Sequence, residues 1–327
     1  MTLSLDAAID SFHPELPIGV GFSAGADSTA LLTACAARWP GQVVALHINH
    51  NLHPASVAFE ERCVSLCRSL NVELRTSRTD ASHKPGQSPE DAARIARYQA
   101  LHTLAGSEEG VGRLKSIALA HHADDQVETM LIALSRGAGL AGLSAMPAQW
   151  QEGDIHFYRP LLQVSRASIE DWLEAAGLGF VDDPSNSNQA FTRNRIRARI
   201  APEIEVAFPF FRDTFTRSAR HCATAQVLLD DLAALELQQV ARPSDGLPRI
   251  KELQKLSAEH QANLLRFWLK SRFGVIPSTA QLSELLRQIG ACVNRGKSIH
   301  IKVGLGFATR KGDVLTWYNP ELLQRKL

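Results

Sequence analysis

The first 120 residues alternate short apolar runs with segments of helical periodicity, and this alternation restricts the fold more than any other feature of the sequence. The apolar runs are residues 17–22, 42–48, 72–76 and 116–120. Between them, apolar residues recur at three-to-four spacing, as in amphipathic helices. Strands that are apolar on both faces and separated by helices predict a parallel sheet covered on both sides. We therefore expect a doubly wound α/β domain, in which ligands bind beyond the carboxyl ends of the strands.

The second half of the chain has a different pattern. Residues 213–240 have the periodicity of one long helix, with apolar positions at Ala219, Ala223, Val227 and Leu235. Proline and glycine residues at 243–248 interrupt it. The remainder predicts a small, mostly helical domain that ends in two strands. The expected organisation is a catalytic domain over 1–215, a linker helix over 216–245 and a smaller domain over 246–327.

The formal net charge of +1 hides an uneven distribution. Residues 1–215 carry 18 Lys and Arg against 25 Asp and Glu, whereas residues 216–327 carry 17 against 9. A basic second half is typical of a segment that contacts a polyanion such as nucleic acid. A solvated basic surface has the same composition, so charge alone leaves both interpretations open.

Several classes of protein are disfavoured by composition. No apolar run approaches the roughly 20 residues that cross a bilayer. The first twelve residues carry Asp6 and Asp10 but no basic residue, unlike a secretory signal. The five cysteines include no CxxC pair, so neither a zinc site nor a disulfide framework is indicated, and Cys63 and Cys67 are expected as buried thiols on one helix face. We expect a cytoplasmic protein without a membrane partner.

The stretch VGFSAGADSTALL (20–32) joins the first expected strand to the first expected helix through small residues. Backbone amides at such a helix start bind anions, and small side chains let phosphate oxygens approach closely. The lysine of a Walker loop is absent, and Asp27 stands in the loop instead. A carboxylate beside phosphates requires a divalent cation between them, so the loop predicts a nucleotide with Mg²⁺ on Asp27. A plain turn with Asp27 as helix cap is the alternative.

A second polar cluster lies in LAHHADDQVETMLIALSRG (119–137), after the fourth expected strand. Helical spacing places four apolar residues on one face: Val127, Met130, Leu131 and Leu134. Asp125 and Glu128 then lie on the opposite face, away from the core, and His121 joins them if the helix extends that far. A metal site, a site for a cationic amine and carboxylates that favour the helix dipole all remain open.

The first loop resembles the SGGxDS signature of the PP-loop ATP pyrophosphatases, which split ATP between its α- and β-phosphates. Ala24 departs from the signature, because it stands where the family has glycine. Alanine is tolerated there if its φ is negative and is strained if its φ is positive. The resemblance implies that the loop residues bind ATP, namely Ser23, Ala24, Gly25, Ala26, Asp27 and Ser28.

Further motifs narrow the resemblance to the tRNA(Ile)-lysidine synthetase family. They are HINHNLHP (47–54), EDAARIARY (90–98), HHADDQVETML (121–131), RGAGLAGL (136–143), RPLL (159–162) and DPSNSNQAFTRNRIR (183–197). The match is strong over roughly residues 15–210 and loose in the helical remainder. Some members of the family carry a further C-terminal domain, and this sequence is expected to end before one.

The resemblance implies a two-step reaction on the wobble cytidine of an isoleucine tRNA with a CAU anticodon. The base oxygen at C2 attacks the α-phosphate of ATP, and the ε-amine of free lysine then displaces AMP to give lysidine. The implied cosubstrate is ATP with Mg²⁺, and the implied partners are the tRNA and lysine; a homodimer is compatible with the sequence. A PP-loop enzyme that thiolates tRNA and a non-catalytic RNA-binding relative are the alternatives. Thiolation is disfavoured because it requires reactive cysteines.

The resemblance also implies roles for the residues that match the motifs. Asp27 would hold Mg²⁺, and His121 would position a carboxylate or a phosphate. Asp125 and Glu128 would orient the lysine amine or share the metal. Arg94 or Arg97 would approach the α-phosphate. The residues expected near the adenine or ribose are His47, Asn49 and His50.

Four arginines at alternate positions complete the expected site: Arg193, Arg195, Arg197 and Arg199. On a helix, Arg193 and Arg197 share one face, and Arg195 and Arg199 lie nearly opposite. One pair is expected to contact tRNA phosphates while the other anchors the acidic first half, because guanidinium groups bind phosphate in bidentate fashion. Arg193 is the residue expected nearest the reacting nucleotide, and a solvated charge run is the alternative.

Overall fold

The computed structural model describes residues 2–49, 56–79, 89–181, 188–292 and 298–320. The chain divides into two compact units, Met1–Cys222 and Ala223–Leu327. Each unit contains its own cluster of buried apolar side chains. None of the helices in the described ranges combines the length and the apolar character needed to cross a membrane.

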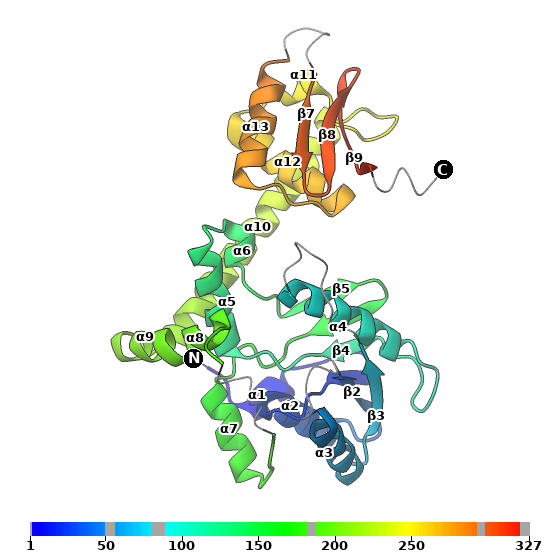
Figure 1. Ribbon diagram of the computed structural model, residues 1–327, viewed down its shortest axis with the longest axis vertical. Coiled ribbons are helices and arrows are strands. Elements are labelled where there is room, and N and C mark those ends of the chain that lie inside the picture. The colour runs from blue at the N-terminus through cyan, green and yellow to red at the C-terminus, as the bar shows by residue number, and fades with distance from the viewer. Residues whose placement is uncertain (1, 50–55, 80–88, 182–187, 293–297, 321–327) are drawn as a thin grey trace. The chain divides into compact units, whose positions relative to one another are not determined.

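The first unit is built on a six-stranded sheet with the order β3-β2-β1-β4-β6-β5. Figure 1 labels its strands β2, β3, β4 and β5. Its strands are β1 (Ile18–Gly21), β2 (Val43–Asn49), β3 (Glu73–Arg78), β4 (Ser116–Ala118), β5 (Gln149–Glu152) and β6 (Ile155–Tyr158). All neighbours are parallel except β5, which runs antiparallel to β6. The four strands predicted from apolar runs are confirmed, and β1 and β4 lie side by side, with Ile18 beside Ser116.

Helices cover both faces of this sheet, which confirms the doubly wound α/β fold. One core lies between the sheet and α1 (Leu5–Asp10), α2 (Ala26–Arg38), α3 (Ser56–Ser69) and α7 (Arg166–Ala175). The core on the other face joins α4 (Pro89–Ala105) to side chains of β2, β4 and β6. The central strands are therefore buried on both sides, which explains their near-continuous apolar sequence.

The hairpin of β5 and β6 was not among the strands predicted from the sequence. β5 is an edge strand whose four residues are exposed or half-buried, so it lacks an apolar run. Ile155 and Phe157 alternate with half-buried residues in β6, a pattern too short to separate a strand from a loop. The strand conformation of β6 is instead stabilised by its parallel pairing with β4, a contact that the local sequence does not specify.

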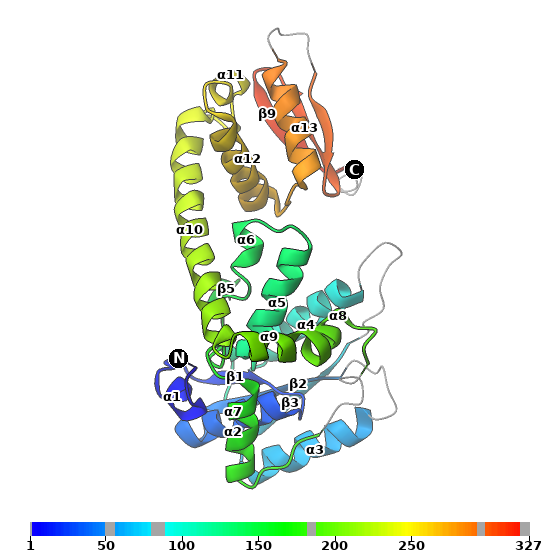
Figure 2. The same cartoon turned by 90° about the vertical axis from the view of Figure 1, so that its left-hand side faces the viewer.

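The remaining helices of the first unit are α5 (Ala123–Ser135), α6 (Leu140–Leu143), α8 (Thr192–Arg195), a π-helix (Ile196–Ile200) and α9 (Ala201–Ala207). The long helix α10 (Phe211–Val240) confirms the prediction for 213–240 (Figure 2). Of its predicted apolar positions Ala219 is buried, whereas Val227 and Leu235 are each 59% exposed. Polar contacts hold the second half of α10 to α12, including a hydrogen bond from Asn263 to the Leu229 carbonyl (2.7 Å).

The second unit packs α11 (Ile250–Leu253), α12 (Ala258–Phe273) and α13 (Thr279–Gly290) against an antiparallel sheet. That sheet has three strands rather than the predicted two: β7 (His300–Val303), β8 (Gly306–Lys311) and β9 (Val314–Tyr318). Gly304 and Gly312 lie in the two connecting turns with φ of 62° and 67°. Glycine adopts such angles without strain, so each turn closes tightly and the segment folds back twice.

Candidate active site

The loop after β1 is closed on itself by two serines. Ser28 Oγ donates to the Gly25 carbonyl and accepts from the Ser23 backbone N–H, each at 3.1 Å, and it also lies 3.1 Å from Ser23 Oγ. Gly25 is the N-cap of α2, and Ala26 is the first helical residue. This arrangement holds small residues at the N-terminus of a 13-residue helix, where free amides favour an anion.

Ala24 has a left-handed backbone, with φ of 61°. Its side chain is buried, and its carbonyl accepts a hydrogen bond from the Val181 N–H at 3.0 Å. The sequence left the sign of φ open, and the structure places Ala24 in the strained case. The loop thus keeps the conformation suited to the glycine of the signature, at a cost of about 1–2 kcal/mol for an L-residue.

Asp27 points one carboxylate oxygen into a buried position without a partner. Among the described residues, Asp27 Oδ1 has no hydrogen bond, while Oδ2 lies 3.7 Å from His122 Nε2. Burial raises the pKa of the Asp27 carboxyl, and His122 partly opposes that shift. When the Asp27 carboxylate is ionised, a positively charged partner at Oδ1 would stabilise it.

His122 lies at the centre of a group of carboxylates, and no role for it was predicted from the sequence. It is the N-cap of α5 and is buried, 3.6–3.7 Å from Asp27, Asp124 and Asp125. Burial opposes its charge, but the contact with Asp124 and the charges of Asp125 and Asp27 outweigh burial, so the pKa of His122 is raised. The sequence feature that could have identified His122 is the pair of adjacent histidines at the start of a helix. Neighbouring side chains point in different directions there, so the two histidines can have different roles.

Asp125 and Glu128 contact two of the predicted arginines. Arg197 donates to Glu128 Oε1 (2.8 Å) and lies 3.5 Å from Asp125 Oδ1. Arg193 donates to Glu128 Oε2 (3.4 Å) and to Thr129 Oγ1 (3.1 Å). The prediction that Arg193 and Arg197 share one helix face is confirmed, since both reach Glu128.

The prediction that these carboxylates face away from the core is wrong for Glu128, which is only 2% exposed. The segment that carries Arg193 and Arg197 covers Glu128. The spacing of residues within one helix cannot predict a contact with a distant segment. Leu134, predicted on the apolar face, is 51% exposed instead. Burial raises the pKa of Glu128 despite the nearby guanidinium groups. For Asp125 burial acts in the same direction, but His122 and His121 outweigh it and hold its pKa below the ordinary value.

His121 lies just before α5 and faces arginines rather than carboxylates alone. Its Nδ1 accepts a hydrogen bond from Arg159 Nε at 3.1 Å. Burial lowers the pKa of His121 to about 4; Asp125 opposes this shift, and Arg159, Arg97 and Arg193 add to it. His121 is therefore a neutral imidazole at physiological pH.

The residues predicted near the adenine or ribose lie at the end of β2. His47 is buried and its Nδ1 donates to the Phe22 carbonyl (2.9 Å), which ties β2 to the loop after β1. Asn49 is buried and donates to Glu60 Oε2 (3.2 Å). His50 lies outside the described residues. Their contact with a nucleotide stays a prediction.

The other predicted arginines are at the surface. Arg195 bonds the carbonyls of Gln189 and Ala190 and the hydroxyl of Thr192, so it closes its own loop. Arg199 is exposed beyond it, and Arg94 is exposed on α4. Arg193 and Arg197 therefore contact Glu128 of α5, whereas Arg199, on the opposite face, is exposed to solvent.

All five cysteines are free thiols. Burial raises the pKa of Cys35 and Cys63 to about 12 and that of Cys67 to about 11. These three thiols are protonated and unreactive at neutral pH, as expected from the sequence for Cys63 and Cys67.

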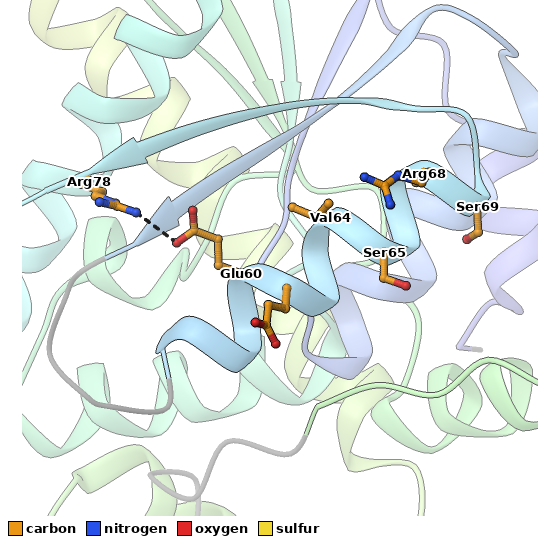
Figure 3. Close-up of a pocket in the computed structure, with 7 residues that line it drawn as sticks. Glu60, Val64, Ser65, Arg68, Ser69 and Arg78 are labelled. Atoms are coloured by element: carbon orange, nitrogen blue, oxygen red, sulfur yellow. Dashed lines mark ion pairs between the residues drawn. The ribbon is translucent and has the colours of Figure 1, made fainter.

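A surface hollow of about 670 Å³ lies along α3, and Figure 3 shows Arg78 paired with Glu60 at its edge (3.6 Å). Its lining includes the polar side chains of Ser65, Arg68 and Ser69. None of the predicted site residues lines this hollow. Glu60 links the hollow to the candidate site, because it also accepts the hydrogen bond from Asn49.

Comparison with known proteins separates the two parts of the chain. The family described as "PP-loop domain" matches residues 3–204, and the family described as "TilS substrate binding domain" matches residues 249–314. The tRNA(Ile)-lysidine synthase of Polaromonas naphthalenivorans is 52% identical over 96% of this chain and 93% of its own length. That of Burkholderia pseudomallei is 38% identical over 88% of this chain, which spans only 59% of that longer relative.

Among solved structures, the U34-tRNA thiolase NcsA from Methanococcus maripaludis is similar in fold. The superposition has a TM-score of 0.56 and covers 66% of this chain and 77% of the thiolase, with 13% sequence identity. At that identity the likeness concerns the fold alone.

The strain at Ala24 predicts an unusual response to glycine. Ala24→Gly should raise the free energy of unfolding by up to about 1 kcal/mol, because relief of the left-handed backbone exceeds the loss of one buried methyl, worth about 0.8 kcal/mol. Ala26→Gly, in the first turn of the same helix, is the matched control and should lower it by about 0.5–1 kcal/mol. Urea unfolding measures both, and equal destabilisation by the two variants would contradict a strained Ala24.

Proposed function

The chain belongs to the tRNA(Ile)-lysidine synthase family, and on that premise we propose that it joins free lysine to C2 of the wobble cytidine in an isoleucine tRNA with a CAU anticodon. ATP is the cosubstrate, and AMP and pyrophosphate are the other products. One observation carries the proposal: His122 contacts both Asp27, in the first turn of α2 after the small-residue loop, and Asp125, at the start of α5. A phosphate loop and an acidic site for an amine thereby lie within reach of one reacting nucleotide.

The proposed reaction has two displacements. In the first, O2 of the cytidine forms a bond to the α-phosphorus of ATP, and the bond to the β-phosphate oxygen breaks to release pyrophosphate. In the second, the ε-amine of lysine forms a C–N bond at C2, the C2–O2 bond breaks, and AMP leaves with the bonding electrons. The ammonium form of lysine must give up a proton before it attacks.

Asp27 is the side chain that fits Mg²⁺. Its buried Oδ1 has no hydrogen-bond partner among the described residues, so a cation would satisfy it. Within the described parts of the chain no group of three or more His, Cys, Asp or Glu side chains has an arrangement that could hold a metal ion by itself, which suits an ion whose other ligands are phosphate oxygens and water. When bound, Mg²⁺ neutralises phosphate charge and increases the electrophilicity of the α-phosphorus.

Asp125 and Glu128 are proposed to receive the lysine ammonium. Both already face guanidinium groups, so the site is built for cations, and an ammonium that replaces Arg197 leaves its charge balance unchanged. Burial raises the pKa of Glu128, which makes its carboxylate a better acceptor for the proton that the amine must lose. Mg²⁺ is assigned to Asp27 alone.

The tRNA is proposed to contact residues 246–327 and the segment of Arg193, Arg195, Arg197 and Arg199. Arg193 pairs with Glu128, one of the carboxylates proposed to receive lysine, which supports its assignment near the reacting nucleotide. The catalytic domain is proposed to be 1–215, with 216–245 as a linker helix. A cytoplasmic location and a homodimer stay predictions. Thiolation is opposed by the buried, protonated thiols of Cys35, Cys63 and Cys67.

The proposal predicts the products directly. Full-length protein with ATP, Mg²⁺, radiolabelled lysine and CAU-anticodon isoleucine tRNA should release one AMP and one pyrophosphate for each lysine incorporated. Nucleoside analysis should place the label on the wobble cytidine. A tRNA with that cytidine replaced by uridine is the matched control. Absence of both AMP and labelled tRNA would leave a non-catalytic RNA-binding protein.

Asp27→Asn removes the carboxylate charge but keeps its size. We expect the rate of pyrophosphate release to fall by about 10²-fold or more, because charge neutralisation at the phosphates is lost. The Kd for tRNA should change less than about threefold. The control is Asp10→Asn, an exposed residue that pairs with Arg38. Unchanged pyrophosphate release in Asp27→Asn would remove this residue from the metal role.

Asp125→Asn tests the amine site. We expect the KM for lysine to rise about 10- to 100-fold, the equivalent of about 1.5–3 kcal/mol for a charged hydrogen bond. Lysine-independent pyrophosphate release should fall less than transfer of lysine. Asp154→Asn is the control, since Asp154 is an exposed partner of Arg113. A normal KM and normal turnover in Asp125→Asn would end the assignment.

A further inference from the structure

Arg159 is buried against neutral partners, which is an unusual environment for a permanent charge. The residue is 8% exposed. Its Nε donates to His121 Nδ1 (3.1 Å), its Nη1 to the Pro147 carbonyl (2.8 Å) and its Nη2 to the Tyr98 hydroxyl (3.1 Å). Its guanidinium carbon lies 4.0 Å from the centre of the Trp150 ring. Burial lowers the pKa of Arg159, which reflects the expense of holding the charge there.

The donor chemistry of Arg159 fixes the state of the neighbouring imidazole. A guanidinium has N–H donors and no acceptor, so the nitrogen that it faces must supply a lone pair. His121 Nδ1 therefore carries no proton. A neutral His121 has its proton on Nε2, on the side of the ring away from Arg159, and an imidazolium would set two N–H groups against each other.

Two further arginines that act on His121 favour the same state. Arg97 from α4 and Arg193 from α8 add positive charge, whereas Asp125 from α5 opposes them. Tyr98 in turn packs against Trp150 and Phe157, with ring centroids 6.0 and 5.4 Å away. Three hydrogen bonds and the Trp150 ring thus orient the guanidinium toward His121.

We propose that Arg159 is a positioning residue that locks His121 as the Nε2–H tautomer, so that His121 acts as a neutral hydrogen-bond donor to a phosphate oxyanion of the substrate and not as a base. This inference rests on the proposed function for the identity of the oxyanion, but the tautomer itself does not depend on it. Arg159 lies in the RPLL motif and Tyr98 in the EDAARIARY motif, and the sequence offered no role for either residue. The chain Tyr98–Arg159–His121 gives them one.

The first test is nuclear magnetic resonance of the full-length protein with ¹⁵N-labelled histidine and without any substrate. The signals of His121 are assigned by their loss in His121→Gln. We expect an unprotonated Nδ1 and a protonated Nε2. A proton on Nδ1 would overturn the inference whether or not the protein makes lysidine, so its failure is distinct from failure of the proposed function.

The second test compares Arg159→Met with Arg159→Lys. Methionine fills similar space without a donor, so His121 should become a mixture of tautomers, and pyrophosphate release should slow about tenfold or more with the KM for ATP within about threefold. Lysine keeps a charged donor and should restore the tautomer and most of the rate. Thermal unfolding checks that both variants fold.

Tyr98→Phe provides a milder perturbation, because it removes the hydroxyl that accepts from Arg159 Nη2 and keeps the aromatic ring. It should shift both the tautomer ratio and the rate in the direction of Arg159→Met, by a smaller factor. If Arg159→Met does not fold, Tyr98→Phe and the wild-type spectrum decide the question. An altered tautomer with unchanged pyrophosphate release, or no change in either, would refute the positioning role.

Discussion

The structure of the candidate site depends on a buried histidine among carboxylates. His122 lies within 3.7 Å of Asp27, Asp124 and Asp125, which come from the first turns of α2 and α5. Those helices follow β1 and β4, which are neighbours in the sheet. Parallel neighbours deliver their carboxyl ends to the same edge, and His122 then draws the acidic groups together. The neighbouring carboxylates raise the pKa of His122, which favours its charged form, and that form offsets the repulsion among them.

A second set of cations surrounds these carboxylates. Arg212, at the start of α10, pairs with Asp124 at 2.6 Å, and Arg197 pairs with Glu128 at 2.8 Å. Asp124 also accepts from the Arg166 backbone, and its pKa is depressed because these contacts and His122 outweigh burial. Asp124 is thus fully engaged in the structure. Asp27 Oδ1, by contrast, has no hydrogen-bond partner among the described residues. The carboxylate oxygen that a bound cation would contact therefore lies beside the small-residue loop that follows β1.

Much of this arrangement could be predicted from local sequence, and the failures have physical causes. Apolar runs located β1 to β4, because strands buried on both faces leave an unambiguous pattern, whereas the edge strand β5 leaves none. The small-residue loop and the acidic start of α5 were identified from residue type. The positive φ of Ala24 was not predicted from the sequence. The Ala24 carbonyl accepts a hydrogen bond from Val181, which is far along the chain, so local sequence does not contain this contact. The burial of Glu128 likewise depends on Arg193 and Arg197, more than sixty residues away.

The two adjacent histidines show why residue type alone does not assign a role. His122 has a raised pKa and His121 a lowered one, although both are buried and both lie near Asp125. At the start of α5 successive side chains diverge, so one imidazole enters the carboxylates and the other meets Arg159. Burial penalises the charged form of each; the carboxylates around His122 outweigh burial, whereas the arginines around His121 add to it. Two identical adjacent residues therefore acquire opposite pKa shifts, one beside the acidic groups and the other beside Arg159.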